Sequence, residues 1–220
     1  MTTIAIFGGT GYAGSAIRDE ALRRGHRVIS VSRTVPASDA SDTPGLEYRY
    51  GSVHDAGLVD EVAADVDVIV VSIRFAPEAS GDGVKLADAF PALTSACAVH
   101  GTRLGVVGGA ASLLVADDGP RLIDTPEFPE EFKEEALSAA EVLEALREDA
   151  TDVDWFYVSP AAAFGSYNPG EPTGKYRVGG DILLTDESGT SEISGADYAL
   201  AFVDEIDSPV HHRTRFTVAY

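Results

Sequence analysis

Four glycines near the start of the chain have the spacing of a phosphate-binding turn. They follow the apolar run at residues 3–7 and fit both Gly9-x-Gly11-x-x-Gly14 and Gly8-x-x-Gly11-x-x-Gly14. In such a turn one glycine allows a sharp bend, one lets a diphosphate approach the backbone, and one lets helix and strand pack closely. A helix that begins behind the turn adds unpaired N–H groups and the positive end of its dipole. The alternative is a glycine-rich turn without this ligand. The residues expected to contact a dinucleotide here are Gly8, Thr10, Gly11, Tyr12, Ala13 and Gly14.

An arginine follows the second apolar run, at the position that distinguishes two nicotinamide cofactors. Arg33 comes directly after residues 28–32, and no Asp or Glu occurs from there until Asp39. In dinucleotide-binding folds an acidic residue at this place binds the ribose 2′-hydroxyl of NAD, whereas an arginine accommodates the 2′-phosphate of NADP. We therefore predict that Arg33, helped by Ser32 or Thr34, binds that phosphate and that NADP(H) is preferred over NAD(H). A solvated arginine at a strand end is the alternative.

The elements that must position these residues alternate between strand and helix. Apolar runs predict strands at residues 3–7, 28–32, 46–50, 67–71, 102–107 and 154–159. Helical spacing of apolar residues predicts helices at 13–24, around 58–62, at 83–99 and at 129–147. Pro91 lies inside the third helix and should kink it or delay its start. This order predicts an α/β fold, a doubly wound parallel sheet with helices on both faces, as one domain over residues 1–220.

The alternation stops after residue 159, where glycine and proline become frequent. We expect residues 160–192 to form a loop-rich substrate lobe over the carboxyl edge of the sheet, with short strand-like pieces around Tyr176 and Leu183. A last helix should start at Ser194 and a last strand should cover residues 215–219. The polar stretch at 36–45 is typical of a loop.

Two further groups of candidate ligands lie where predicted strands end. Ser72, Ile73 and Arg74 follow the fourth strand, and ligands of open α/β sheets bind just past the carboxyl ends of the strands. Asp55 precedes the second helix and either caps that helix or meets the adenine. All four are predicted to contact the cofactor.

The composition excludes several classes of partner. The net charge is −20, from 36 acidic and 16 basic residues, and so acidic a surface repels nucleic acid and anionic membranes. It suits an ordinary acidic protein, or one adapted to high salt. No apolar run is long enough to cross a bilayer and no leader precedes the first strand, so we expect a cytoplasmic protein, monomeric or homodimeric.

Metal binding is not expected from this sequence. Cys97 is the only cysteine, which leaves neither a disulfide framework nor a cysteine cluster for zinc, and its apolar surroundings indicate a small core residue. The five histidines do not form a set with metal-ligand spacing.

Four blocks of sequence resemble the atypical branch of the short-chain dehydrogenase/reductases. They are GGTGYAG at 8–14, VVGGAAS at 106–112, SPAA at 159–162 and ISGADYA at 193–199. That branch includes NADH-flavin reductase-like proteins, biliverdin reductase B and NmrA-like proteins. The resemblance covers nearly the whole chain and implies an NAD(P)-binding Rossmann fold. It also implies that Gly108, Gly109 and Ser112 lie beside the nicotinamide, and that Pro160 and Ala161 cover its amide.

The chain departs from this superfamily at its catalytic motif, Tyr-x-x-x-Lys. The residues four positions before the three lysines are Gly81, Pro129 and Glu171, so no tyrosine is placed to move a proton. Lys133 either binds the cofactor ribose or phosphate or is a solvated helix lysine. Two further candidates for catalysis remain open between a substrate contact and a structural role, namely Ser112, which could instead cap a turn, and Tyr176, which could instead pack.

Two functions are compatible with these residues. The first is an NADPH-dependent oxidoreductase that transfers hydride to a flavin, a quinone-like compound or another conjugated small molecule, because such an acceptor can take its proton from solvent. The flavin would be a substrate rather than a prosthetic group. The second is a non-catalytic NADP(H)-sensing regulatory protein of the NmrA-like type. A sugar-nucleotide isomerase or epimerase has less support, because the chain lacks the tyrosine–lysine pair and a large C-terminal substrate domain.

Overall fold

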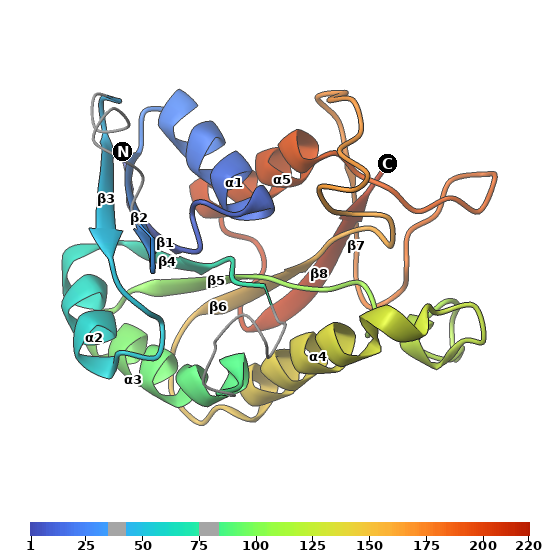
Figure 1. Ribbon diagram of the computed structural model, residues 1–220, viewed down its shortest axis with the longest axis horizontal. Helices are drawn as coiled ribbons and strands as arrows, with labels where there is room; N and C mark the ends of the chain where they lie inside the picture. Colours follow the sequence, from blue (N-terminus) through green and yellow to red (C-terminus); the bar gives the residue numbers. More distant parts are fainter. Residues whose placement is uncertain (35–42, 75–83) are drawn as a thin grey trace.

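The computed structural model describes residues 1–34, 43–74 and 84–220, and they are built around an 8-stranded sheet. The strand order is β3-β2-β1-β4-β5-β6-β8-β7, and every neighbouring pair is parallel except β7–β8 (Figure 1). The predicted doubly wound parallel sheet is therefore confirmed. The strands are β1 Thr3–Phe7, β2 Arg27–Ser32, β3 Leu46–Tyr50, β4 Val68–Val71, β5 Arg103–Val107, β6 Trp155–Ser159, β7 Arg177–Gly179 and β8 Thr214–Ala219.

Helices cover both faces of this sheet. α1 and α5 pack on one face, and α2, α3 and α4 pack on the other (Figure 1). Alternate residues of β1 serve the two layers, because Ile4 and Ile6 join the first and Ala5 and Phe7 the second. The α-helices are α1 Tyr12–Arg23, α2 Ala56–Asp65, α3 Phe90–His100, α4 Lys133–Glu148 and α5 Gly195–Asp207. Short 3₁₀ turns lie at η3 Leu86–Ala89, η4 Leu122–Asp124 and η5 Glu130–Phe132.

Proline decides where two of the helices begin. Pro91 occupies the first turn of α3, where its missing N–H costs nothing, so the expected delay of that start is confirmed. The helix predicted from residue 129 begins with the 3₁₀ turn η5, and α4 starts only at Lys133. Of the predicted loop at 36–45, residues 36–42 lie outside the described residues, as does Gly83 of the predicted third helix. Cys97 is buried in α3, where burial raises the pKa of its thiol to about 12.

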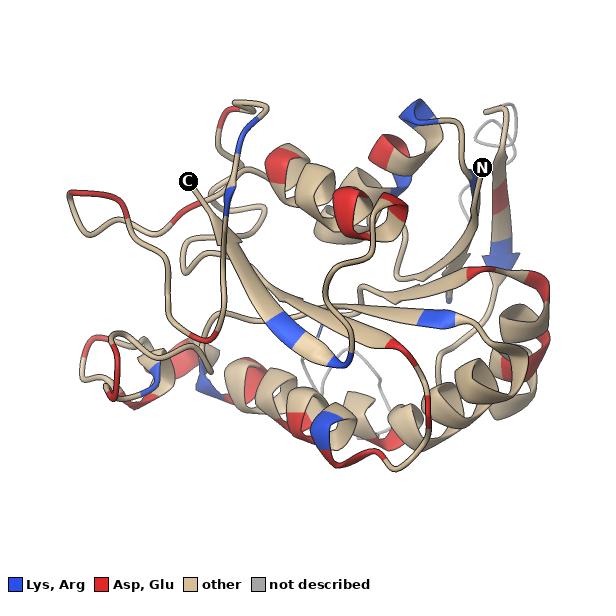
Figure 2. Cartoon of the chain, turned by 180° about the vertical axis from the view of Figure 1, so that it is seen from behind, with Lys and Arg blue, Asp and Glu red and all other residues tan. Residues whose placement is uncertain are grey.

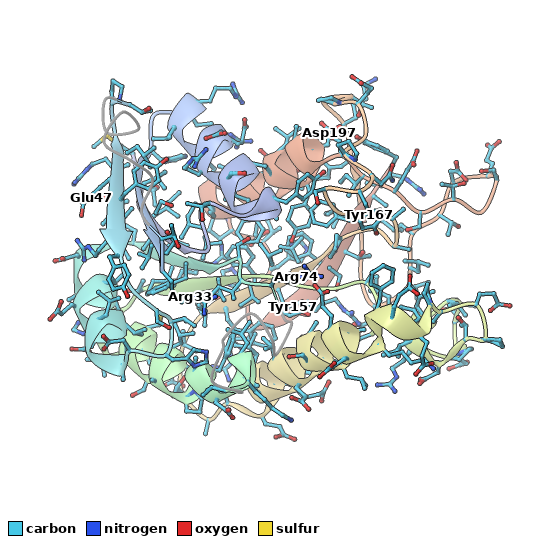
Figure 3. The ribbon with its side chains drawn as sticks, in the orientation of Figure 1. Arg33, Glu47, Arg74, Tyr157, Tyr167 and Asp197 are labelled. Carbon is cyan, nitrogen blue, oxygen red and sulfur yellow. The ribbon has the colours of Figure 1, made fainter. Side chains whose placement is uncertain are left out.

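Residues 160–192, for which a loop-rich lobe is predicted, contain β7 as their one named strand within the described chain. Asp197, in the first turn of α5, fixes this lobe to the helix (Figure 3). Its carboxylate accepts hydrogen bonds from Thr173 N at 2.7 Å, Gly174 N at 2.9 Å and the Tyr220 hydroxyl at 2.6 Å. Burial opposes ionisation of Asp197, but these bonds outweigh it and lower the pKa of the carboxyl. The charged form of Asp197 therefore stabilises the folded lobe.

We expect Asp197→Asn to lower the free energy of unfolding at pH 7 by about 1–3 kcal/mol, since amide replaces a buried, fully bonded carboxylate. Because the folded-state pKa of Asp197 is depressed, its contribution is present above the ordinary carboxyl pKa of about 4 and is lost as the pH falls below it. Urea unfolding of both proteins between pH 7 and pH 3 measures this. The difference between them should shrink toward pH 3, and a constant difference would contradict the role given to the charge.

Candidate functional site

The turn between β1 and α1 is closed so tightly that two of its positions require glycine. Gly8 has φ of +90°, and a Cβ on it would lie 2.1 Å from the Ser72 carbonyl oxygen. A Cβ on Gly14 would lie 2.2 Å from the carbonyl oxygen of Gly8. Gly11 N also donates to that oxygen, at 3.0 Å. Gly9 is closely packed as well, because a Cβ there would lie 2.5 Å from Ser30 Oγ, so the geometry is compatible with both glycine spacings.

The first turn of α1 opens toward solvent at this point. Thr10 and Gly11 are exposed, and Gly11 is the N-cap without a side-chain hydrogen bond from any described residue. No acidic residue lies in the first turn of α1. The first N–H groups of the helix can therefore accept an anion. Ala13 is buried in the core between α1 and the sheet. The Tyr12 ring contacts the Phe164 ring, with 5.4 Å between their centroids.

A cleft of about 400 Å³ lies at the carboxyl ends of β2 and β3. Arg33 is exposed at its rim (Figure 3). Asp55 also lines the cleft, but its Oδ1 accepts from Gly57 N and Leu58 N, both at 3.1 Å, so it caps α2. The residues that line the cleft are Arg33, Tyr50, Gly51, Ser52, His54, Asp55 and Leu58. This arrangement places a cation beside a space large enough for part of a nucleotide.

Arg33 is an exposed basic residue on a surface that is mostly acidic. Figure 2 shows acidic residues (red) spread along the outer helices and loops, with fewer basic residues (blue) between them. The net charge of −20 opposes the approach of an anionic ligand in general. Arg33 and the N-terminus of α1 lie at the carboxyl ends of two adjacent strands, β2 and β1, and carry local donors on this mostly acidic surface.

The segment after β4 lies against the glycine turn. The Ser72 carbonyl is the group that Gly8 approaches, Ser72 N donates to Phe7 O at 2.8 Å, and Ile73 packs on the core. Arg74 is exposed and its guanidinium reaches Glu135 of α4 at 3.3 Å (Figure 3). This ion pair crosses from the end of β4 to the first turn of α4.

A buried tyrosine shapes the turn after β5. Tyr157 of β6 lies beneath it, because a Cβ on Gly108 would come within 2.0 Å of its ring (Figure 3). Its hydroxyl accepts from Gly109 N at 3.1 Å and donates to Ala139 O of α4 at 3.2 Å. Burial raises the pKa of this phenol to about 12, which keeps it neutral. Pro160 and Ala161 are buried at the end of β6, beside this turn. Tyr157 could not be identified from the sequence, because within an apolar strand it resembles the other buried residues.

Ser112 is held by a buried arginine that sequence reasoning also missed. Arg215 of β8 has a side chain 3% exposed, and its Nη1 donates to Ser112 Oγ and to Ser159 Oγ, both at 3.3 Å. Its Nε donates to Asp181 at 2.6 Å. Ser112 Oγ is thus an acceptor, and no described residue accepts its proton. A single charged residue in a strand without other charges was the available signal.

The other two candidates for catalysis are engaged on the surface. Lys133 Nζ pairs with Glu130 at 2.6 Å. Tyr176 donates to the carboxylate of Asp204, and its pKa is raised by burial and by this hydrogen bond. Asp204 lies nine residues beyond the start of α5, about 14 Å along the helix from the carboxyl edge of the sheet. The structure therefore does not bring Tyr176 together with the glycine turn, Arg33 and Ser112.

The described residues contain neither a metal-binding cluster nor a membrane-spanning helix. No group of three or more His, Cys, Asp or Glu in this part of the chain could hold a metal ion. None of its helices combines the length and apolarity needed to cross a membrane.

Comparisons with known proteins identify the family of this chain and several similar proteins. Residues 8–209 match the model of the NAD(P)H-binding family. The uncharacterized protein YwnB of Bacillus subtilis is 37% identical over 216 residues, 98% of this chain and 97% of that protein. The crystal structure of a "putative NADH-flavin reductase" from Streptococcus pneumoniae is 32% identical with a TM-score of 0.85, covering 100% and 99% of the two chains. That of a "putative epimerase" from Bacteroides thetaiotaomicron is 33% identical with a TM-score of 0.86, covering 99% and 96%.

Proposed function

The chain belongs to the NAD(P)H-binding family, and from that premise we propose that it is an NADPH-dependent reductase of a flavin or another planar conjugated compound. The observation that carries this proposal is the turn between β1 and α1. There the lack of side chains at Gly8 and Gly14 lets the turn pack closely on Ser72 and on the start of α1, directly in front of a helix N-terminus without acidic residues. The neighbour described as a "putative NADH-flavin reductase" gives the acceptor class its support.

Each part of the cofactor is contacted by a different group of residues. The glycine turn and the first N–H groups of α1 bind the diphosphate, and Arg33 binds the 2′-phosphate that distinguishes NADP(H). Asp55 orders the cleft beside Arg33 by capping α2. Ser72, Ile73 and Arg74 border the middle of the dinucleotide. Gly108, Gly109, Pro160 and Ala161 surround the nicotinamide, with Gly109 fixed by Tyr157.

Bound NADPH supplies the hydride, so the protein has to orient the acceptor and stabilise the charge it gains. An acceptor that takes up hydride carries an extra negative charge until solvent protonates it. Ser112 has a hydroxyl proton to donate to that acceptor, because its oxygen is already bonded to Arg215. The buried Arg215 cation behind Ser112 adds favourable electrostatics. This scheme needs no Tyr-x-x-x-Lys.

A non-catalytic sensor of NADP(H) is the second candidate. One observation favours it, namely that the lysine nearest to the expected catalytic position, Lys133, pairs with Glu130 and has Pro129 rather than a tyrosine four positions before it. A sensor would bind the same cofactor and distinguish its oxidised from its reduced form without consuming it.

Stopped-flow oxidation of NADPH with a panel of acceptors separates the two. We expect turnover with at least one of riboflavin, FMN, FAD and short-chain quinones, after calorimetry has shown that NADPH binds. Tight NADPH binding without turnover on any acceptor would reject the reductase and favour the sensor.

We expect Ser112→Ala to lower kcat by about tenfold, the equivalent of one hydrogen bond made to the charge that develops on the acceptor. The Kd of NADPH should change little, because Arg33 and the glycine turn hold the cofactor. Steady-state kinetics with the best acceptor and calorimetry with NADPH measure the two quantities. An unchanged kcat would mean that Ser112 only anchors its loop to Arg215.

A further inference from the structure

Two exposed aromatic rings from distant parts of the chain face each other. Phe132 is 44% exposed and Tyr167 is 68% exposed. Their ring centroids are 6.5 Å apart and their planes are 17° from parallel. Large aromatic side chains gain most when they are buried, so a stacked pair left this open has free faces that a ligand could cover.

The pair lies at the carboxyl edge of the sheet, where the cofactor site is. Phe132 immediately precedes α4, and a crossover helix begins at the edge where the preceding strand ends. Tyr167 lies on the segment that leaves β6 (Figure 3). On this segment Phe164 contacts Tyr12 at the start of α1, and Tyr167 contacts Phe132. Residues 161–168 therefore reach from the helix layer of α1 to that of α4, across the ends of the central strands.

A tight turn fixes the orientation of Tyr167. Asn168 N donates to Gly165 O at 3.0 Å, and Asn168 Nδ2 donates to Ala163 O at 3.2 Å. The Tyr167 ring lies over Gly165, where a Cβ would come within 2.6 Å of it. The ring is thus held in place by backbone close to it rather than by burial. On the opposite side, Phe132 is fixed by the 3₁₀ turn, in which its N donates to Pro129 O at 3.2 Å.

We infer that Phe132 and Tyr167 form the stacking site for the planar ring system of the acceptor, which deepens the proposed reductase function and rests on it. Their exposed ring surfaces, with planes 17° from parallel, offer a flat ring system a face on which to stack. Such a site selects flat aromatic compounds over sugars and aliphatic carbonyls.

Riboflavin, a flat ring system without phosphate, is the probe that tests this inference. Its fluorescence is titrated with the full-length protein at saturating NADP⁺. We expect Phe132→Leu and Tyr167→Leu each to raise the Kd of riboflavin by about tenfold, and to weaken the quenching caused by stacking. Tyr167→Phe keeps the ring and should stay within about twofold of wild type. Leu137→Ala is the matched control, since Leu137 is 50% exposed on α4, the helix that Phe132 precedes, and should leave the Kd unchanged.

Calorimetry with NADPH on the same proteins separates this inference from the proposed function. NADPH should bind all of them equally. If NADPH binds but riboflavin does not, or if riboflavin binds the leucine variants as tightly as wild type, the stacking site is rejected and the cofactor site stands. If the wild-type protein does not bind NADPH, the proposed function is rejected, and the stacking site, which rests on it, is rejected too.

Discussion

Gly14→Ala should weaken NADPH binding by about 100-fold or more while leaving the sheet folded. The new methyl group would lie 2.2 Å from the carbonyl oxygen of Gly8, which is backbone and cannot rotate away. The turn must therefore move away from α1, and a shift of about 1 Å is enough to displace the N–H groups that hold the diphosphate. Calorimetric titration with NADPH measures the affinity, and circular dichroism with thermal unfolding checks the fold.

Gly57→Ala is the control for this substitution. Gly57 is also in the first turn of a helix, α2, but a Cβ there would make an ordinary contact of 3.4 Å with Asp55. Alanine at this position should leave NADPH affinity unchanged and stabilise the helix slightly. If Gly14→Ala is folded and binds NADPH as tightly as wild type, the glycine turn is not the diphosphate site.

Arg33→Asp should reverse the preference of the protein between the two nicotinamide cofactors. A charge-assisted hydrogen bond to the 2′-phosphate is lost and a like charge takes its place, so NADPH should bind about 100-fold more weakly. NADH lacks that phosphate and should bind as well as before or better, because the new carboxylate can accept from its ribose 2′-hydroxyl. Separate calorimetric titrations with NADPH and NADH give the two affinities.

Arg27→Asp supplies the same change of charge at the other end of the same strand. Arg27 begins β2, six residues before Arg33, which is about 20 Å along an extended chain. It should leave the ratio of the two affinities unchanged, since charges this far apart are screened at physiological ionic strength. Unchanged selectivity in Arg33→Asp would remove the assignment of the 2′-phosphate and leave the fold and the diphosphate site intact.

The parts of the fold that depend on short-range chemistry could be predicted from the sequence. The strand β1, the glycine turn and α1 follow one another within a few residues, and their pattern predicted the geometry that the structure has. Asp55 precedes α2 directly, so its capping role was among the two alternatives stated. The buried strands β4, β5 and β6 were recognisable because a parallel sheet covered on both faces leaves each strand apolar throughout.

The parts that depend on partners distant in the sequence could not be predicted. Ser112 meets Arg215 across 103 residues, and Gly109 meets Tyr157 across 48. Tyr176 had been a candidate for the substrate site, but its partner Asp204 lies on α5, away from that edge. Phe132 and Tyr167 come together because of how residues 160–192 pack near the start of α4, and no local sequence pattern predicts this contact. In each case the sequence alone allows two roles for the side chain, and only the fold shows which residue it contacts.

Calorimetric titration of the wild-type protein with NADPH, and then with NADH, tests whether the glycine turn holds a dinucleotide. We predict one nicotinamide dinucleotide per chain, with NADPH bound more tightly because Arg33 reaches its 2′-phosphate. Absence of heat with both compounds, from protein shown to be folded, would contradict the claim that the turn between β1 and α1 holds a dinucleotide.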